Sequence, residues 1–364
     1  MKKKKVLHFI AALGNGGAER QLIELLKKNK NHSVVIFKDA GVYKNALSKL
    51  NIKYWELGVK NKFLIFFKIR IISKIIKEMN PHIIQAWMYN ACFFSVICRM
   101  LSIYKAPLIW TIRCSDMTTK YYTITLNFLI FFCRLLSKKV DSVVYNSFSG
   151  MQYHTNLGFS SKNKTVIFNG TDSSKFRRSI ALRKSLRNKF KYKKNDIVII
   201  FAARVDPMKN HHGFLNAFKL AKNNGLDNLK LVLVGKDTER LKLPYDSIAL
   251  GMKLNIEKYY NLADVIILPS LFGEGFSNVL VEGMLTNLLP VSSNVGDSKK
   301  IIGHTGFIVK ELNDSGFVNV LVKISKSKKI TINQFGKKAR LRASKNFTPK
   351  IMIESYNNIY SKIS

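Results

Sequence analysis

The sequence predicts an α/β protein made of two doubly wound, Rossmann-like domains, and three observations lead to this prediction. The chain has 364 residues, which is too long for one ordinary core and suggests two domains of roughly 150–200 residues each. Short apolar runs, typical of buried parallel strands, alternate with longer helical stretches. The pattern starts afresh after a basic, glycine-free stretch at residues 173–195. We therefore place the boundary near residues 171–175 and expect domains at residues 1–172 and 173–346.

The first half opens with an apolar run at residues 6–10, which predicts a strand. Gly14, Gly16 and Gly17 follow, and a helical stretch occupies residues 18–26. A glycine turn between a strand and a helix start lets backbone amides approach an anion, although a plain tight turn explains the glycines equally well. The turn has neither the third glycine of a dinucleotide fingerprint nor the Gly-Lys-Ser/Thr of a P-loop. Later strands are predicted at residues 33–37, 83–87, 108–112, 142–145 and 165–168.

The chain is strongly basic, with 61 Lys and Arg against 22 Asp and Glu and a formal net charge of +39. Such a charge fits three classes of partner: nucleic acid, an anionic membrane surface or phosphorylated substrates. The cations are spread along the whole chain instead of being gathered in an arm, and no nucleic-acid-binding motif accompanies them, so we expect no nucleic-acid partner. Composition bias in the source genome is an alternative explanation for the abundance of Lys, Ile and Asn.

We expect a cytoplasmic protein, for three reasons. The lysine-rich start resembles a signal peptide, but the apolar run after it is short, contains His8 and leads into glycines instead of a cleavage site. No window reaches the roughly 20 apolar residues that a membrane span needs. The cysteines form no CxxC pair and lie in apolar surroundings, which predicts buried free thiols of a reducing compartment. They are Cys92, Cys98, Cys114 and Cys133.

Two segments of the first half, residues 62–77 and 121–139, each combine a long apolar, aromatic run with cations. A helix of this composition can lie in a membrane interface with its basic side chains near anionic headgroups. The alternative is a helix packed on the sheet, with lysine stems extending outward to solvent. Because two such segments occur in the same half of a very basic chain, we favour the membrane interface.

In the second half, a strand predicted at residues 197–203 is followed at once by Arg204 and Lys209. Two cations five residues apart on a strand-end loop suit a diphosphate, because a guanidinium offers paired donors and an ammonium a mobile point charge. Further strands are predicted at residues 229–234, 247–251, 263–270 and 291–295.

The strand at residues 263–270 leads into a loop with Glu274 and then a helical stretch with Glu282 about two turns inside it. At that edge of an open α/β sheet ligands bind. The amides of Phe276, Ser277, Asn278 and Val279 would face an anion from the helix start. Two carboxylates beside these amides suit a ligand with hydroxyls and phosphates. One loop glutamate and one solvated helix glutamate are an equally simple interpretation.

Together these motifs resemble glycosyltransferase family 4, a retaining, nucleotide-sugar-dependent group with the GT-B fold. The resemblance rests on Gly-Gly-Ala-Glu-Arg at 16–20, Asn-Ser at 146–147, Asn-Gly-Thr-Asp at 169–172, Arg204 with Lys209 and Asn210, the segment at 263–270, and Glu274 with Glu282. It implies two Rossmann-like domains that face a central cleft, the first on the acceptor side toward the membrane and the second on the donor side. The last segment, residues 347–364, resembles the family helix that crosses back to the first domain.

The resemblance also implies roles for individual residues. Glu274 would hold hydroxyls of the donor sugar and Glu282 the ribose hydroxyls, while Glu257 falls where the family approaches the base. Arg204 and Lys209 would neutralise the diphosphate leaving group. The amides of residues 276–279, with those of Gly16 and Gly17, would donate to the phosphates.

Two further points concern cofactors and a departure from the family. Family members transfer sugars without a bound metal, and the sequence contains no His/Asp/Cys metal cluster, so we expect no cofactor beyond the nucleotide sugar. Arg113 stands where many members have a histidine, and we expect it to line the cleft on the acceptor side; an ordinary solvated arginine is the alternative.

The resulting prediction is a transferase at the inner face of the cytoplasmic membrane, which extends a lipid-linked saccharide for a bacterial surface polysaccharide. Its partners would be a nucleotide sugar, the lipid-linked acceptor and an anionic membrane surface. One alternative keeps the fold but makes the chain a sugar-nucleotide epimerase or a soluble transferase with a small acceptor. Another is a non-enzymatic basic protein that binds lipid headgroups or nucleic acid, which leaves the two glutamates unexplained.

Overall fold

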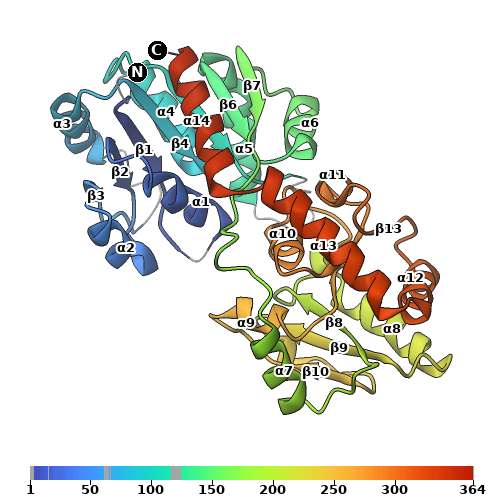
Figure 1. The fold of residues 1–364 in the computed structure, drawn as a ribbon. Coiled ribbons are helices and arrows are strands. Elements are labelled where there is room, and N and C mark those ends of the chain that lie inside the picture. Colours follow the sequence, from blue (N-terminus) through green and yellow to red (C-terminus); the bar gives the residue numbers. More distant parts are fainter. Residues whose placement is uncertain (1–3, 15, 61–64, 66, 116–123, 364) are drawn as a thin grey trace. The chain divides into compact units, whose positions relative to one another are not determined.

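The computed structural model describes residues 4–14, 16–60, 65, 67–115 and 124–363. The chain forms two compact units. Met1–Gly170 and Pro349–Ser364 make the first, and Thr171–Thr348 makes the second. Each unit is a parallel sheet covered by helices (Figure 1), as the alternating pattern predicts.

The first unit contains a seven-stranded sheet in the order β3-β2-β1-β4-β5-β6-β7, with all neighbours parallel. The predicted bounds of β1, β4, β5 and β6 are confirmed, whereas β2 begins one residue earlier and β7 two residues earlier than predicted. The short edge strand β3 was not predicted. The strands are β1 (Val6–Ile10), β2 (His32–Ile36), β3 (Tyr54–Glu56), β4 (Ile83–Trp87), β5 (Leu108–Ile112), β6 (Ser142–Tyr145) and β7 (Asn163–Val166).

Helices pack on both faces of this sheet. One core contains side chains of α3 (Ile69–Met79), α4 (Met88–Met100) and α5 (Ile124–Leu136). The other contains side chains of α1 (Gly17–Leu26) and of the last helix, α14 (Pro349–Ile363). The expectation that the last helix returns to the first domain is therefore correct. Two shorter helices complete the unit, α2 (Lys44–Lys49) and α6 (Phe148–Asn156).

The two basic, apolar segments behave differently, as far as the structure describes them; residues 62–64, 66 and 121–123 lie outside the described part. In α3, three isoleucines are buried in the core and the cations Arg70, Lys74 and Lys77 are exposed, which is the packed alternative. In α5, Ile130 and Cys133 are buried, while Ile124, Phe128, Phe131, Phe132 and Leu135 remain exposed. Only α5 presents a large apolar face. Among the described helices, none is long and apolar enough to cross a membrane.

The second unit repeats the design with a six-stranded parallel sheet in the order β10-β9-β8-β11-β12-β13. The order reverses between β8 and β11, and ligands of open α/β sheets bind at such a reversal, beyond the carboxyl ends of the strands. The strands are β8 (Ile197–Ala202), β9 (Leu229–Val234), β10 (Ser247–Ala249), β11 (Val265–Leu268), β12 (Leu289–Ser293) and β13 (Phe307–Val309).

The helices of the second unit also lie on both faces. Helices α8 and α12 contribute to the core on one face, and α10 and α13 pack on each other and on β11 and β12. The helices are α7 (Ile180–Lys189), α8 (His211–Asn223), α9 (Ile256–Tyr260), α10 (Asn278–Leu285), α11 (Ser298–Ile302), α12 (Asp314–Lys326) and α13 (Lys329–Asn346).

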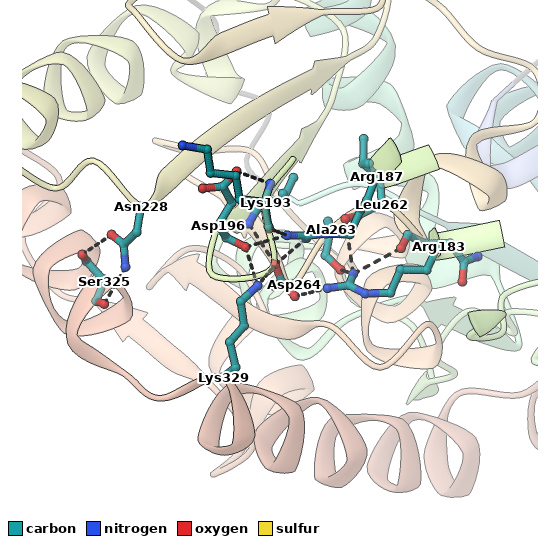
Figure 2. A network of polar contacts seen from close by, with 12 residues as sticks. Arg183, Arg187, Lys193, Asp196, Asn228, Leu262, Ala263, Asp264, Ser325 and Lys329 are labelled. Carbon is teal, nitrogen blue, oxygen red and sulfur yellow. Dashed lines mark hydrogen bonds and ion pairs between the residues drawn. The ribbon is translucent and has the colours of Figure 1, made fainter. Parts of the chain in front are cut away.

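A buried carboxylate, Asp264, fastens two helices to the amino edge of the second sheet (Figure 2). Arg183 and Arg187 of α7 and Lys329 of α13 all form ion pairs with it. Burial alone would raise the pKa of Asp264, but the attraction of Arg183 and Lys329 outweighs it and the pKa lies below its usual value. Part of the positive charge of the chain therefore serves this structural contact.

Candidate active site

The predicted cations and carboxylates of the second unit lie on loops at adjacent strand ends. Strands β8 and β11 are parallel neighbours, so their carboxyl ends meet at one edge of the sheet. Arg204 and Lys209 follow β8, and Glu274 follows β11. The site is thus at the point where the strand order reverses.

Lys209 and Glu274 form a largely buried ion pair, with Nζ donating to Oε1. Only 15% of the Lys209 side chain and 8% of the Glu274 side chain are exposed. Ser270 Oγ donates to the same oxygen at 2.8 Å. Within the described part of the chain no donor reaches Glu274 Oε2, so this oxygen can accept a hydrogen bond from a ligand.

The loop that carries Glu274 is fixed by backbone contacts with its neighbours. Gly296 has φ +59°, and a Cβ there would lie 2.0 Å from the Glu274 carbonyl oxygen, so only glycine fits this approach. The amide of Asp297 donates to the Gly275 carbonyl at 3.2 Å, and that of Leu271 to the Met208 carbonyl at 2.9 Å. The last contact joins the two loops that bear Lys209 and Glu274.

Arg204 is not part of this pair. Its side chain is 62% exposed, and its Nε and one terminal nitrogen donate to Asp206 Oδ2 at 3.1 and 2.7 Å. Asp206 also accepts from the Met208 amide through Oδ1 at 3.0 Å. Asp206 was not predicted as part of the site, although a carboxylate two residues after an arginine indicates that the two side chains can pair.

Glu282 is buried as well, with 5% of the residue exposed. It is the fifth residue of α10, just over one turn from the helix start, so the prediction of two turns was wrong. Its Oε2 accepts a hydrogen bond from the Tyr260 hydroxyl of α9 at 2.9 Å. The alternative of a solvated helix glutamate is therefore wrong for Glu282, while Glu274 does lie on a loop but is only 7% exposed.

Glu257 is the second residue of the short helix α9, which ends with Tyr260. Positions three residues apart share a helix face, so Glu257 lies on the side of α9 that approaches Glu282. Lys175 Nζ is 3.7 Å from Glu257 Oε2, an ion pair beyond hydrogen-bond distance. That oxygen is buried and has no hydrogen-bond partner among the described residues.

Residues 276–279 do form a helix start. Ser277 precedes α10 and caps it, with its Oγ accepting from the Leu280 amide at 3.4 Å. Asn278 and Val279 are the first helical residues, whose amides point outward from the helix end. The Phe276 ring packs edge-on against Phe347, with 5.3 Å between the ring centres.

In the first unit, Gly16 and Gly17 lie at the start of α1 as predicted. The Glu19 carboxylate folds back over this start, and a Cβ on Gly16 would lie 2.2 Å from Glu19 Oε2. Burial raises the pKa of Glu19, and a backbone hydrogen bond partly offsets this. The helix start therefore already holds a carboxylate, which an anionic ligand would have to displace.

Arg113, directly after β5, is half-buried, so the interpretation of an ordinary solvated arginine is wrong. Its guanidinium donates to the Tyr356 hydroxyl at 3.1 Å and to Asn169 Oδ1, and it lies 5.5 Å from the Trp87 ring centre. Its Nε is buried without a partner among the described residues. Burial lowers the pKa of Arg113, while the contact with Tyr356 opposes the shift.

Two further features concern the residues that could bind a metal and the cysteines. Among the described residues, no three or more His, Cys, Asp or Glu side chains gather as a metal site would require. All four cysteines are free; Cys92, Cys98 and Cys133 are buried, as predicted, and Cys114 is partly exposed.

Two family models match the chain, one to each half. "Glycosyltransferase Family 4" matches residues 15–175, and "Glycosyl transferases group 1" matches residues 183–342. The chain is 23% identical to the N-acetylgalactosamine-N,N'-diacetylbacillosaminyl-diphospho-undecaprenol 4-alpha-N-acetylgalactosaminyltransferase of Campylobacter jejuni, over 92% of this chain and 93% of the relative. It is also 23% identical to the capsular polysaccharide biosynthesis glycosyltransferase CapM of Staphylococcus aureus, over 99% and 98% of the two chains.

Solved structures show the same fold. The Anabaena protein Alr3699/HepE in complex with UDP superimposes with a TM-score of 0.83 at 20% identity, over 98% of this chain and all of the other. WaaG, a glycosyltransferase involved in lipopolysaccharide biosynthesis, gives a TM-score of 0.73 at 13% identity, over 98% and 99% of the chains. With both halves matched by glycosyltransferase models in the expected order, the chain belongs to glycosyltransferase family 4 and is a nucleotide-sugar-dependent glycosyltransferase of the GT-B fold.

Proposed function

We propose that this transferase moves a sugar, with retention of configuration, from a nucleotide-diphosphate sugar to a lipid-linked saccharide in bacterial surface polysaccharide or glycan synthesis. The observation that carries the proposal is the buried pair of Lys209 and Glu274 at adjacent strand ends. A cation for a diphosphate and a carboxylate for sugar hydroxyls are the groups that such a donor requires side by side. The Campylobacter jejuni relative, whose name specifies a diphospho-undecaprenol acceptor, supports the acceptor class.

In this proposal the donor replaces the direct contact between Lys209 and Glu274. Glu274 accepts hydrogen bonds from hydroxyls of the sugar, while Lys209 and Arg204 contact the diphosphate. As the bond from sugar C1 to the diphosphate oxygen breaks, a bond from C1 to the acceptor oxygen forms on the same face, and the proton of the acceptor hydroxyl passes to the departing diphosphate oxygen. Negative charge grows on the departing diphosphate, so fixed cations act most strongly in the transition state. With these cations present, the scheme requires no metal ion.

The nucleotide lies along α9 and α10 in this scheme. Glu282 accepts from the ribose hydroxyls, held in place by Tyr260 at 2.9 Å. Glu257 lies toward the base, and the amides of residues 276–279 donate to phosphate oxygens. In the first unit, Gly16 and Gly17 offer further amides, and Arg113 serves the acceptor.

The membrane part of the proposal rests on charge and on α5. A chain with a net charge of +39 is attracted to an anionic surface, where lipid-linked acceptors are found. The exposed aromatic face of α5 adds apolar area that can enter the headgroup region. We therefore propose a peripheral position on the inner face of the cytoplasmic membrane.

A screen of UDP-, GDP-, dTDP- and ADP-sugars tests the proposal. Purified protein is incubated with each donor, with and without extracted lipid-linked saccharides, and nucleoside diphosphate release is measured with thermal stabilisation. We expect one donor to stabilise the protein and to release its nucleotide faster when acceptor is present. Glu274→Gln should lower turnover at least about tenfold and change donor affinity much less, with the exposed Glu311→Gln as the matched control.

Other outcomes identify other functions. An epimerase of the same fold would alter the sugar without any acceptor, which product analysis by mass spectrometry detects. Equal losses of turnover and affinity in Glu274→Gln would argue against a role at the sugar. If no nucleotide sugar binds under any condition, the transferase proposal fails.

A further inference from the structure

We infer that the first unit carries a binding cavity for the hydrocarbon chain of a polyprenyl diphosphate, between the carboxyl edge of its sheet, α4 and α5. The inference rests on the proposed function and names the lipid that its acceptor site takes. It concerns residues separate from the predicted donor site.

The cavity has a volume of about 580 Å³. Its lining is mainly apolar and includes Phe37 after β2, Phe93 and Phe94 from α4, and Phe128 and Phe132 from α5. Pockets of roughly 300–1,000 Å³ enclose most of a drug-sized ligand. This volume therefore suits the first few isoprene units of a chain, and the remainder would stay in the bilayer.

Two lysines give the cavity a charged rim. Lys38 and Lys60 line it, are both exposed, and have no ion-pair partner among the described residues. Backbone hydrogen bonds bring them to the same edge, because Val59 N donates to the Phe37 carbonyl at 2.8 Å and Gly58 N to the Lys38 carbonyl at 3.2 Å. Among the described residues that line the cavity, none carries a carboxylate. An apolar ligand with an anionic head matches this arrangement, since cations bind phosphate oxygens.

The cavity is continuous with the exposed face of α5. Phe128 and Phe132 line it, yet 61% and 46% of these residues remain exposed. Ile124, Phe131 and Leu135 extend the same helix's apolar surface, and Arg134 is the only charged residue in the 13 residues of α5. A lipid chain can therefore pass from a bilayer into the cavity along apolar side chains, without the cost of crossing polar surface.

Photolabelling tests the cavity directly. Wild-type protein in neutral detergent micelles is irradiated with a farnesyl diphosphate that carries a diazirine near its first isoprene unit, and the labelled peptides are mapped. We expect labels on α4 and α5 around Phe93 and Phe128. Unlabelled undecaprenyl diphosphate should remove them, and a phosphatidylglycerol of ordinary acyl chains should not.

A pair of tryptophan variants on α5 sharpens the test. Thr125→Trp fills the cavity, because Thr125 lines it, whereas Phe131→Trp adds the same side chain at an exposed position outside the lining. We expect labelling to fall about tenfold in Thr125→Trp and to stay at the wild-type level in Phe131→Trp. Thermal unfolding shows whether each variant is folded; if Thr125→Trp is not, the competition in the wild type decides.

The outcomes separate this inference from the proposed function. Labels spread over the surface, equal competition by phosphatidylglycerol, or full labelling of a folded Thr125→Trp would each overturn the cavity. If the wild type still releases nucleotide in the donor screen, the transferase proposal survives that result. If labelling is specific but no donor is used, the cavity stands and the transferase proposal fails.

Discussion

Because Lys209 and Glu274 form an ion pair, we expect these two positions to respond to mutation in a different way from Arg204. Lys209 is largely buried beside its partner, while Arg204 is exposed and held by Asp206. In the proposed mechanism both cations contact the diphosphate, but only Lys209 also neutralises a buried carboxylate in the absence of ligand. We therefore expect removal of Lys209 to affect both the reaction and the folded state.

We expect Lys209→Ala and Arg204→Ala each to raise the barrier for sugar transfer by about 2–4 kcal/mol, by analogy with the loss of one preorganised donor to a developing anion. The measurement is kcat with saturating donor. Lys209→Ala should also lower the melting temperature, because Glu274 loses its cation. The exposed Lys219→Ala on α8 is the control, and wild-type kcat in either test variant would exclude that residue from the site.

Tyr260→Phe tests whether Glu282 serves the nucleotide. The variant removes the hydroxyl that donates to Glu282 at 2.9 Å, and hydrogen bonds to charged groups contribute about 1.5–3 kcal/mol. We expect the nucleotide Kd to rise about tenfold, measured by calorimetry, with a modest fall in the free energy of unfolding. The neighbouring Tyr259→Phe is the control. A loss of stability with unchanged Kd would make Glu282 a purely structural residue.

For individual residues, the sequence predicted which residue types lie at the site better than it predicted their hydrogen-bond partners. The strand-end positions of Arg204, Lys209 and Glu274 follow from local patterns, so their neighbourhood could be predicted. The roles of Asp206 and Tyr260 could not, because their hydrogen bonds depend on loop conformation and on the packing of α9 against α10. The half-buried state of Arg113 likewise depends on Tyr356, a residue 243 positions away in the sequence.

Among the elements, α7 and α13 are both tied to the second sheet through ion pairs with Asp264. Three cations converge on a carboxylate whose side chain is 1% exposed. Replacing the carboxylate would leave these cations crowded around a neutral group, and breaking a buried ion pair by removing one partner typically costs about 3–5 kcal/mol. The network lies at the amino edge of the sheet, opposite the predicted donor site, so it can be altered without touching that site.

Asp264→Asn should therefore lower the free energy of unfolding by about 3–5 kcal/mol, measured by denaturant titration. Because the folded-state pKa of Asp264 is depressed, the wild type has this stabilisation above the unfolded pKa of about 3.9 and loses it as the pH falls through the lower folded value. The free energy of unfolding of the Asp264→Asn variant should not show this acid-dependent loss. Asp227→Asn, at a side chain that is 86% exposed, should cost at most about 1 kcal/mol. Equal losses in the two variants would contradict the assignment.

Element prediction succeeded where strands are buried and long enough to show a continuous apolar run, as in β1, β4, β8 and β9. Three strands have only three residues each; β10 was predicted, whereas the edge strands β3 and β13 were not. The segments at residues 62–77 and 121–139 both mix apolar residues with cations, yet α3 exposes its three cations, whereas α5 exposes five apolar side chains. That difference depends on which side of each helix meets the sheet, which composition does not specify.

The molecule as a whole combines a large positive charge with one exposed apolar face. We expect it to float with anionic liposomes at low salt and to be partly released at high salt, since screening weakens the attraction of exposed charges. The fraction retained at high salt should fall in Ile124→Ser and stay unchanged in Leu341→Ser, an equally exposed apolar position in the second unit. Absence of binding at every salt concentration would refute the membrane proposal.

The overall architecture was predictable because each half repeats the same alternation of strands and helices, and because the spaced motifs follow the order of a known family. The sequence pattern alone could not show that the first sheet has its second core completed by α14. Met352, Tyr356 and Tyr360 are buried there with side chains of β1 and β4, and that contact joins residues more than two hundred positions apart.

Because α14 completes a core of the first unit, the order in which the chain is synthesised on the ribosome affects folding. Domains usually fold in the order in which they emerge, the N-terminal one first. Here all of Thr171–Thr348 leaves the ribosome before Pro349–Ile363 can supply the missing part of the first unit. The unit that begins first is therefore finished last, and until then it exposes an incomplete core that a chaperone can bind.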